Sequence, residues 1–307
     1  MDSSDNRHTQ INMFALTDAQ SLVQTEGLHG SRSHDAPNKK RAPPEDAWTE
    51  AKIPRSATKN SLRVKWESPW QKYDKVYDIE LGGSVEVAIG KVPPFKLVHV
   101  RAFSKPVAEK TLHMFRQVQH RNIVAALEAF ATDDSLYIVL EHMPVSLEWI
   151  VRSPAYPNEG QLAAILGQIL NGVAYIAAEG FQHGSLCCAN ILLKTNGDVK
   201  IANQECCHVM SQPKGGSCDV RALSFITMEL MQKYVKEDGA IGVDDLRRWY
   251  SNSDAVGFLS ATTSVESAEE LLKHPLLKRP WQKESLLGII SLAQVCIRGR
   301  YKYTPRE

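Results

Sequence analysis

The sequence predicts a two-lobed α+β protein with a small, strand-rich N-terminal lobe and a larger, helical C-terminal lobe. Segments between Tyr77 and His142 are rich in β-branched and aromatic residues and are separated by glycine and proline, which is typical of strands. Beyond His142, apolar residues recur at the helical period, first over 162–176 and then over 220–230. A strand-rich half followed by a helix-rich half indicates two lobes of different type.

The individual elements follow from the same patterns. We expect strands at 77–83, 85–89, 95–103, 123–130 and 136–142, with one short helix at 107–119. A further short helix begins near Glu269 and ends at His274, because Pro275 stops it.

Three segments of different composition divide the chain. Residues 1–61 are polar and lack periodicity, so we expect a disordered tail. Residues 62–279 form the folded domain, with an N-lobe at about 66–142 and a C-lobe at about 143–279. Residues 280–307 form a C-terminal helical extension. Its segment 284–298 is apolar nearly all round, so we expect it to be buried as an extra helix rather than to dock a partner.

Composition argues against several partners and locations. Lys and Arg (36) nearly balance Asp and Glu (35), so whole-chain charge favours neither nucleic acid nor a membrane surface. The first residues are polar, unlike a signal peptide, and no run of about 18 apolar residues suggests a membrane span. Six cysteines are too few for a disulfide scaffold. We expect an intracellular protein in the cytoplasm, with the nucleus as the alternative if Lys39-Lys40-Arg41 acts as an import signal.

One motif carries a family resemblance. The sequence H-G-S-L-C-C-A-N-I-L-L at 183–193 resembles the catalytic loop of protein kinases, H-R-D-L-x-x-x-N. Five further segments resemble kinase elements in family order over about 73–277: 120–124, 136–141, 197–202, 219–223 and 267–277. The resemblance implies a serine/threonine-kinase-like fold.

The resemblance also assigns positions to the phosphoryl-transfer machinery. The catalytic base falls on Ser185, a neutral hydroxyl, and the metal-binding aspartate of D-F-G falls on Asn203. Asn190, the second metal ligand of active kinases, is present. The phosphate-binding lysine falls on Arg101, and its glutamate partner falls on Thr111, with Glu109 as a minor alternative after a register shift.

Other family features are altered as well. His99 replaces a small residue beside the adenine site, so we expect its ring to crowd the nucleotide. Gly82 and Gly83 are the glycines near the expected phosphate loop, and they fit an ordinary β-turn equally well. The segment between Asn203 and Asp219 lacks an A-P-E motif, so the substrate loop looks deleted.

These substitutions predict a degenerate member, a pseudokinase that acts as a binding scaffold or allosteric regulator and is not an enzyme. We expect no catalytic residue, no metal site, and weak or absent binding of ATP and magnesium, with Arg101, Asn190 and Asn203 contacting nucleotide if any binds. The partners would be proteins of unknown identity. Two alternatives stay open: an atypical active serine/threonine protein kinase that transfers phosphate from ATP, and a kinase-fold module whose pocket holds another ligand.

Four cysteines leave one question open. The pairs Cys187-Cys188 and Cys206-Cys207 flank loops that lie close together in the kinase fold, near two histidines. Clustered thiolates bind zinc or undergo redox chemistry, but adjacent pairs do not match the usual C-x-x-C spacing, and buried cysteines often act as small hydrophobic residues.

Overall fold

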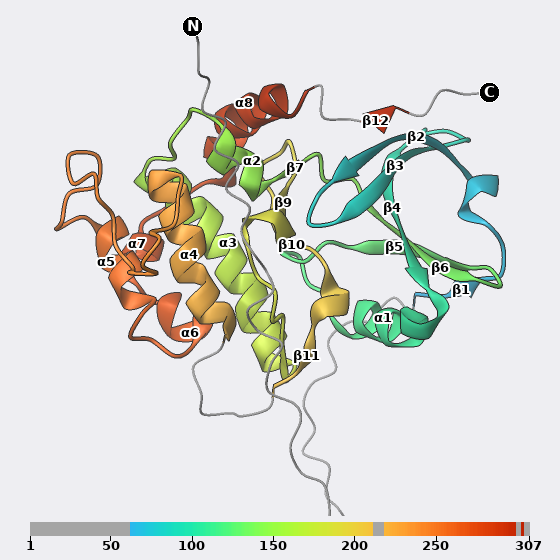
Figure 1. Ribbon diagram of the computed structural model, residues 1–307, viewed down its shortest axis with the longest axis horizontal. Helices are drawn as coiled ribbons and strands as arrows, with labels where there is room; N and C mark the ends of the chain where they lie inside the picture. Colours follow the sequence, from blue (N-terminus) through green and yellow to red (C-terminus); the bar gives the residue numbers. More distant parts are fainter. Residues whose placement is uncertain (1–61, 211–217, 299–301, 304–307) are drawn as a thin grey trace, which may run out of the picture. The chain divides into compact units, whose positions relative to one another are not determined.

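The N-terminal lobe is built on a twisted sheet, antiparallel except for the parallel pair β1–β5, with one helix against it (Figure 1). The computed structural model describes residues 62–210, 218–298 and 302–303. Within these ranges seven strands form the sheet in the order β1-β5-β6-β4-β3-β2-β12. Their bounds are β1 Val64–Lys65, β2 Tyr73–Glu80, β3 Ser84–Gly90, β4 Leu97–Ser104, β5 Ala126–Ala131, β6 Ser135–Glu141 and β12 Lys302–Tyr303; helix α1 spans Lys105–Gln117.

Two strands begin later than the sequence pattern predicts. Strand β4 starts at Leu97 because Pro93-Pro94 and a left-handed Phe95 (φ 51°) form a loop before it. Strand β5 starts at Ala126 because Ile123 pairs with Ile201 of the other lobe instead of extending the strand. The Ile123–Ile201 bridge matters for function, because it joins the segment before β5 to the segment that leads into Asn203.

The C-terminal lobe is helical, with a three-stranded sheet in the order β10-β9-β7 and a strand pair β11-β8 (Figure 1). Its helices are α2 Leu147–Arg152, α3 Glu159–Ala178, α4 Cys218–Gln232, α5 Asp254–Ala261, α6 Ala268–Leu271, α7 Pro275–Lys278 and α8 Leu287–Ile297. The short strands are β7 Val145–Ser146, β8 Phe181–Gln182, β9 Ile191–Leu193, β10 Val199–Ile201 and β11 His208–Val209. The 3₁₀ turns of the whole domain are η1 Pro69–Gln71, η2 Cys188–Asn190, η3 Gln204–Cys206 and η4 Lys283–Leu286. A β-sheet lobe and a helical lobe confirm the predicted α+β class.

Helix α3 is the central element of the large lobe. It begins with a capping box in which Asn158 and Gln161 exchange side-chain and backbone hydrogen bonds. It is the one described helix long and apolar enough to cross a membrane, with a mean hydropathy of 1.4 over the most apolar window. However, 67% of that window is buried inside the domain, as expected for a core helix.

The C-terminal extension differs from the prediction of a fully buried helix. Helix α8 packs against α2 on the outside of the large lobe (Figure 1). Leu286, Ile290 and Ile297 are buried, but Leu292 and Val295 are 47% and 57% exposed. The helix contacts the domain on one side, so its other apolar side faces outward. After α8, the backbone at β12 pairs antiparallel with β2 at the open edge of the N-lobe sheet.

Candidate functional site

The loop around Ser185 is held by helix α4. Both carboxylate oxygens of Asp219 accept backbone hydrogen bonds, from the N–H of His183 at 2.7 Å and from that of Gly184 at 2.9 Å. The buried His183 ring donates from Nε2 to the carbonyl of Ala202 at 2.8 Å. These three bonds fix the loop on the α4 side and on the β10 side, and they leave the Ser185 residue exposed.

The structure brings the residues predicted from sequence into one network. Arg101 Nη1 on β4 donates to Asn203 Oδ1 at 2.7 Å. Asn203 Nδ2 donates to Asn190 Oδ1 at 2.9 Å, and Asn190 Nδ2 donates to the carbonyl of Ser185 at 2.6 Å. A continuous chain of hydrogen bonds therefore runs from the small lobe to the catalytic-loop position of the large lobe. It depends on Asn203, whose left-handed backbone (φ 64°) is a conformation that asparagine tolerates better than most residues.

The β2–β3 turn rests directly on this network. Asn203 Nδ2 also donates to the carbonyl of Gly82 at 2.6 Å. Gly82 has a φ of +67°, and a Cβ placed there would lie 2.9 Å from the Ala189 carbonyl oxygen and would overlap Asn190 Oδ1. Only glycine allows this approach, because an added methyl group would collide with backbone and amide oxygens. The turn thus covers the site that the family uses for phosphate groups.

Arg101 has an ion-pair partner that the sequence reasoning missed. Its Nη1 lies 2.6 Å from Glu205 Oε1, and the two side chains are only 15% and 16% exposed. The expectation that Arg101 lacks a partner, based on Thr111, is therefore wrong. Thr111 is indeed buried and carries no charge, whereas Glu109 is exposed and lines a separate pocket on the outer side of α1.

Glu205 stands where active kinases have the glycine of D-F-G, so position by position it shows only the loss of a flexible residue. The sequence does offer one signal for its role: a carboxylate two residues after Asn203, in the segment that lies close to the cation of β4. Its neighbour Gln204 is buried and donates from Nε2 to the carbonyl of Val124. This bond anchors η3 to the small lobe where the family has a packed aromatic ring.

Two histidines meet where β4 pairs with the end of β6, His99 on β4 and His142 just after β6. His99 lies two residues before Arg101 on β4, so both side chains point to the same face of the sheet. His99 is almost fully buried, and its Nε2 lies 3.0 Å from Nδ1 of His142. Burial, and secondly the His142 ring, lower the pKa of His99 to about 3. Burial lowers the pKa of His142 too, so the pair is neutral near pH 7 and one ring donates to the other.

The four clustered cysteines have raised thiol pKa values, so they are protonated near neutral pH. Burial raises the pKa of the Cys188 thiol well above its usual range and that of Cys207 to about 12. Burial and the adjacent Glu205 carboxylate raise the pKa of Cys206, while the Ser185 hydroxyl hydrogen-bonds to it and partly opposes the shift. In the part of the chain that the structure describes, no three His, Cys, Asp or Glu side chains gather as metal ligands do.

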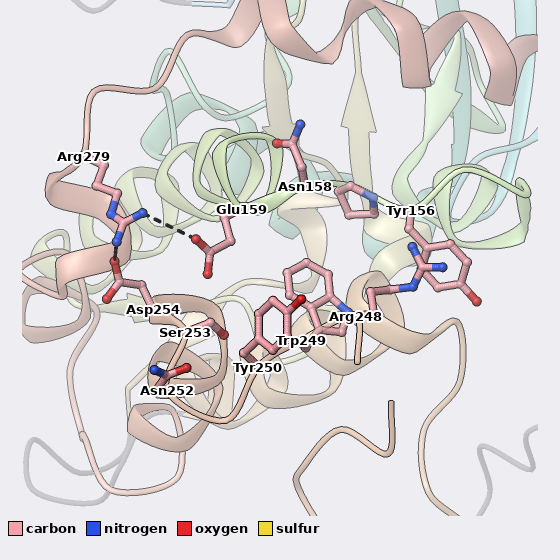
Figure 2. Close-up of a pocket in the computed structure, with 11 residues that line it drawn as sticks. Tyr156, Asn158, Glu159, Arg248, Trp249, Tyr250, Asn252, Ser253, Asp254 and Arg279 are labelled. Carbon is pink, nitrogen blue, oxygen red and sulfur yellow. Dashed lines mark hydrogen bonds and ion pairs between the residues drawn. The ribbon is translucent and has the colours of Figure 1, made fainter. Parts of the chain in front are cut away.

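A second hollow lies in the large lobe, away from this network. It has a volume of about 490 Å³ and is lined in part by the starts of α3 and α5 (Figure 2). Arg279 bridges its two acidic walls, pairing with Asp254 and with Glu159 at 3.5 Å. Arg248 stacks over the Tyr156 ring at 3.9 Å. Arg279 thus offsets one of the two negative charges of the acidic walls within the pocket itself.

Comparison with known proteins identifies the family. Residues 86–238 match the protein kinase domain. The chain is 27% identical over 212 residues to the serine/threonine-protein kinase shk1/pak1 of Schizosaccharomyces pombe, covering 56% of this chain and 32% of that protein. It is 31% identical over 108 residues to cyclin-dependent kinase 12 of Caenorhabditis elegans (31% and 15%), and 38% identical over 96 residues to mitogen-activated protein kinase kinase kinase 1a of Physcomitrium patens (31% and 12%). In each case the match spans about a third or less of the relative's length.

This chain belongs to the protein kinase superfamily. The matched segment contains the hydrogen-bond chain from Arg101 to Ser185, although Gly82 lies before it, so the family assignment covers most of the site. The relatives are named as kinases, and kinases are enzymes that transfer phosphate from ATP with magnesium. Two predictions are therefore contradicted: that the protein is not an enzyme, and that it uses no ATP or magnesium. The substitutions at Ser185 and Asn203 led to both, because sequence alone shows a lost charge but not what the rest of the site supplies.

Proposed function

We propose that this chain is an atypical serine/threonine protein kinase that uses ATP as the phosphate donor. The observation that carries the proposal is the convergence of Arg101, Asn190 and Asn203 in one network at the junction of the two lobes. Phosphoryl transfer depends mainly on positioning and on neutralising charge, with little covalent work for the protein. A buried cation beside two amide side chains supplies part of both requirements.

The donor set near Asn203 suits a magnesium ion only after a rearrangement. Asn190 and Asn203 offer amide oxygens and Glu205 offers a carboxylate, which are the ligand types that magnesium accepts. In the structure, however, Asn190 Oδ1 and Asn203 Oδ1 are engaged by protein N–H donors, and Glu205 Oε1 is paired with Arg101. The Gly82 turn also lies on the site. The metal site does not fit in this arrangement, so we derive no step through it.

The first requirement of this function is therefore an opening of the β2–β3 turn. Nucleotide phosphates need the space that Gly82 occupies, so the Asn203–Gly82 hydrogen bond must break when ATP enters. Arg101 Nη2 already faces that turn, 3.6 Å from where a Cβ of Gly83 would lie. We expect the guanidinium to bind phosphate oxygens from this direction.

The test is a phosphotransfer assay with radiolabelled ATP, the full-length chain and a generic serine/threonine peptide mixture, in magnesium and then in manganese. We expect label in peptide or in the chain, lost in Arg101→Met, which keeps much of the side-chain volume but removes the cation. Lys91→Met, which removes an exposed small-lobe lysine outside the network, is the matched control. Absence of transfer by the unmodified chain in both metals would refute the proposal.

A second candidate function is the binding of a protein partner in a way that does not depend on phosphoryl transfer. The closed Gly82 turn and the hydroxyl at position 185 favour it, because a self-contained hydrogen-bond network stabilises the domain without nucleotide. The name of another relative, CTD kinase subunit alpha of Schizosaccharomyces pombe, describes that protein as part of an assembly. The test compares the unmodified chain with Arg101→Met in binding to an identified protein partner. Equal binding by both, with phosphate transfer by neither, would favour partner binding over kinase activity. For both functions we propose an intracellular location.

A further inference from the structure

The guanidinium of Arg101 makes its polar contacts through one nitrogen only, and it lies over the Phe103 ring with Cζ 5.1 Å from the ring centroid. Its Nη1 is engaged twice, by Glu205 Oε1 at 2.6 Å and by Asn203 Oδ1 at 2.7 Å. Its Nη2 faces the β2–β3 turn near Gly83 and has no hydrogen-bond partner among the described residues. A planar fork anchored through one nitrogen presents its other nitrogen in a fixed direction. That direction is the space under the turn.

The anchoring carboxylate comes from an unexpected element. In kinases the cation of this strand pairs with a glutamate on the following helix. Here the helix presents Thr111 on its buried side, while Glu109 is exposed beside Lys105 on the outer side of α1. Glu205 belongs to η3, in the segment that follows Asn203, and η3 packs against α1. Among the described residues, the charge that pairs with Arg101 has thus moved from the helix to the η3 turn.

The Arg101–Glu205 ion pair is largely buried, and this makes the two side chains hard to separate. A cation and a carboxylate that are each about 85% covered cannot separate without leaving a poorly hydrated charge behind. The turn that carries Glu205 is itself held by the Gln204 hydrogen bond to Val124. The position of the Arg101 guanidinium therefore depends directly on η3, and on helix α1 only through the packing of α1 against η3.

We infer that Glu205 is the positioning residue for Arg101, and that the η3 turn, rather than helix α1, sets whether the arginine faces the phosphate groups of a nucleotide. This inference rests on the proposed ATP-dependent function for its role in binding, but the pair itself does not. Glu205 touches neither nucleotide nor substrate in this role and acts through the arginine.

The first experiment measures the KM for ATP and kcat of the full-length chain in the phosphotransfer assay, with Glu205→Gln compared against Glu109→Gln. We expect Glu205→Gln to raise the KM for ATP by about tenfold with kcat within about twofold, because ground-state phosphate binding is what the arginine supplies. Glu109→Gln should match the unmodified chain, and Glu205→Asp should recover most of the affinity. Equal effects of the two glutamine variants, or a fall in kcat at constant KM, would overturn the inference.

The second experiment separates this inference from the proposed function. It records the side-chain ¹⁵N resonances of arginine in the nucleotide-free chain, with Arg101→Lys used to assign the Arg101 signal. We expect a distinct, slowly exchanging guanidinium signal that Glu205→Gln shifts or broadens and Glu109→Gln leaves in place. If this holds while no ATP binds, the proposed function fails and the pair stands. If Glu205→Gln leaves the signal unchanged, the inference fails whatever the kinase activity is.

Discussion

Replacing Asn203 with aspartate tests how much the domain depends on its central hydrogen-bond network. Asn203 accepts from Arg101 through Oδ1 and donates through Nδ2 to the Gly82 carbonyl at 2.6 Å and to Asn190 Oδ1 at 2.9 Å. Aspartate keeps the first bond, because a carboxylate accepts from a guanidinium. It loses both donated bonds and places an oxygen where the amide nitrogen faced two other oxygens.

The expected loss of stability follows from these three contacts. Leaving two largely buried acceptors without a donor costs about 1–3 kcal/mol each, and the new charge-assisted bond to Arg101 returns about 1–2 kcal/mol. At the middle of these ranges the cost is about 4 kcal/mol and the return about 1.5 kcal/mol, so the expected net loss for Asn203→Asp is about 2–3 kcal/mol. The left-handed backbone adds little, because aspartate tolerates that conformation nearly as well as asparagine.

Urea unfolding of the nucleotide-free chain, followed by tryptophan fluorescence, measures this loss. With an m-value of about 2 kcal/mol per molar urea, the midpoint should fall by about 1–1.5 M. Asn252→Asp is the matched control, since Asn252 is exposed at the rim of the large-lobe pocket and should change the midpoint little. An Asn203→Asp midpoint equal to that of the unmodified chain would refute the idea that the Gly82 turn is held by Asn203.

Three further outcomes follow from the structure. Burial in the folded domain lowers the pKa of His99 to about 3 and lowers that of His142, so unfolding takes up protons below pH 6.5. Stability should therefore fall as pH drops below 6.5, by up to about 1.4 kcal/mol per pH unit from His99 until pH approaches 3, with a further loss from His142. A pH series of urea midpoints should show a shallower fall for His142→Gln, and an equal slope would contradict the assignment. Gly82→Ala should destabilise the domain by about 2–4 kcal/mol, because the left-handed backbone is strained and the new methyl group collides with neighbouring oxygens. Gly239→Ala, at a similar φ of +71° with no atom within 4 Å, should cost only about 1 kcal/mol. Equal thermal midpoints for the two variants would show that the Gly82 turn does not contact the Asn203 network. Arg279→Gln should lower stability by less than about 1 kcal/mol, because its guanidinium is exposed, and a loss above about 2 kcal/mol by urea titration would mean that the large-lobe pocket depends on it.

Sequence patterns predicted the lobes well because each lobe has a strong periodicity of its own. The helix at 162–176 and the strand ending in the hinge are recognisable from apolar spacing alone. The limits were set by contacts between distant segments. Phe95 belongs to a loop because of the prolines before it, and Ile123 leaves the sheet because Ile201 pairs with it. Strand β12 was missed entirely, since two residues carry no pattern.

The site was predictable by position but not by interaction. Arg101, Asn190 and Asn203 were placed together because the family order of motifs fixes which loops meet. What those loops do to one another depends on geometry that no motif encodes: one nitrogen of Asn203 joins two elements, and Glu205 pairs with Arg101 from an unexpected segment. A substitution read position by position shows what has been removed, while its replacement partner can lie anywhere in the fold.

The pairing of β12 with β2 has a consequence for how the protein is made. The N-lobe sheet gains its outermost strand from residues 302–303, which are synthesised after the entire helical lobe. Until they emerge from the ribosome, β2 exposes unpaired backbone groups at Tyr77 and Asp78, and exposed strand edges promote association between chains. Since domains generally fold in order from the N-terminus during synthesis, the small lobe forms first and this part of β2 stays unpaired while the large lobe is being made. The interval between making β2 and making β12 is therefore the period in which a nascent chain most needs a chaperone to cover this edge.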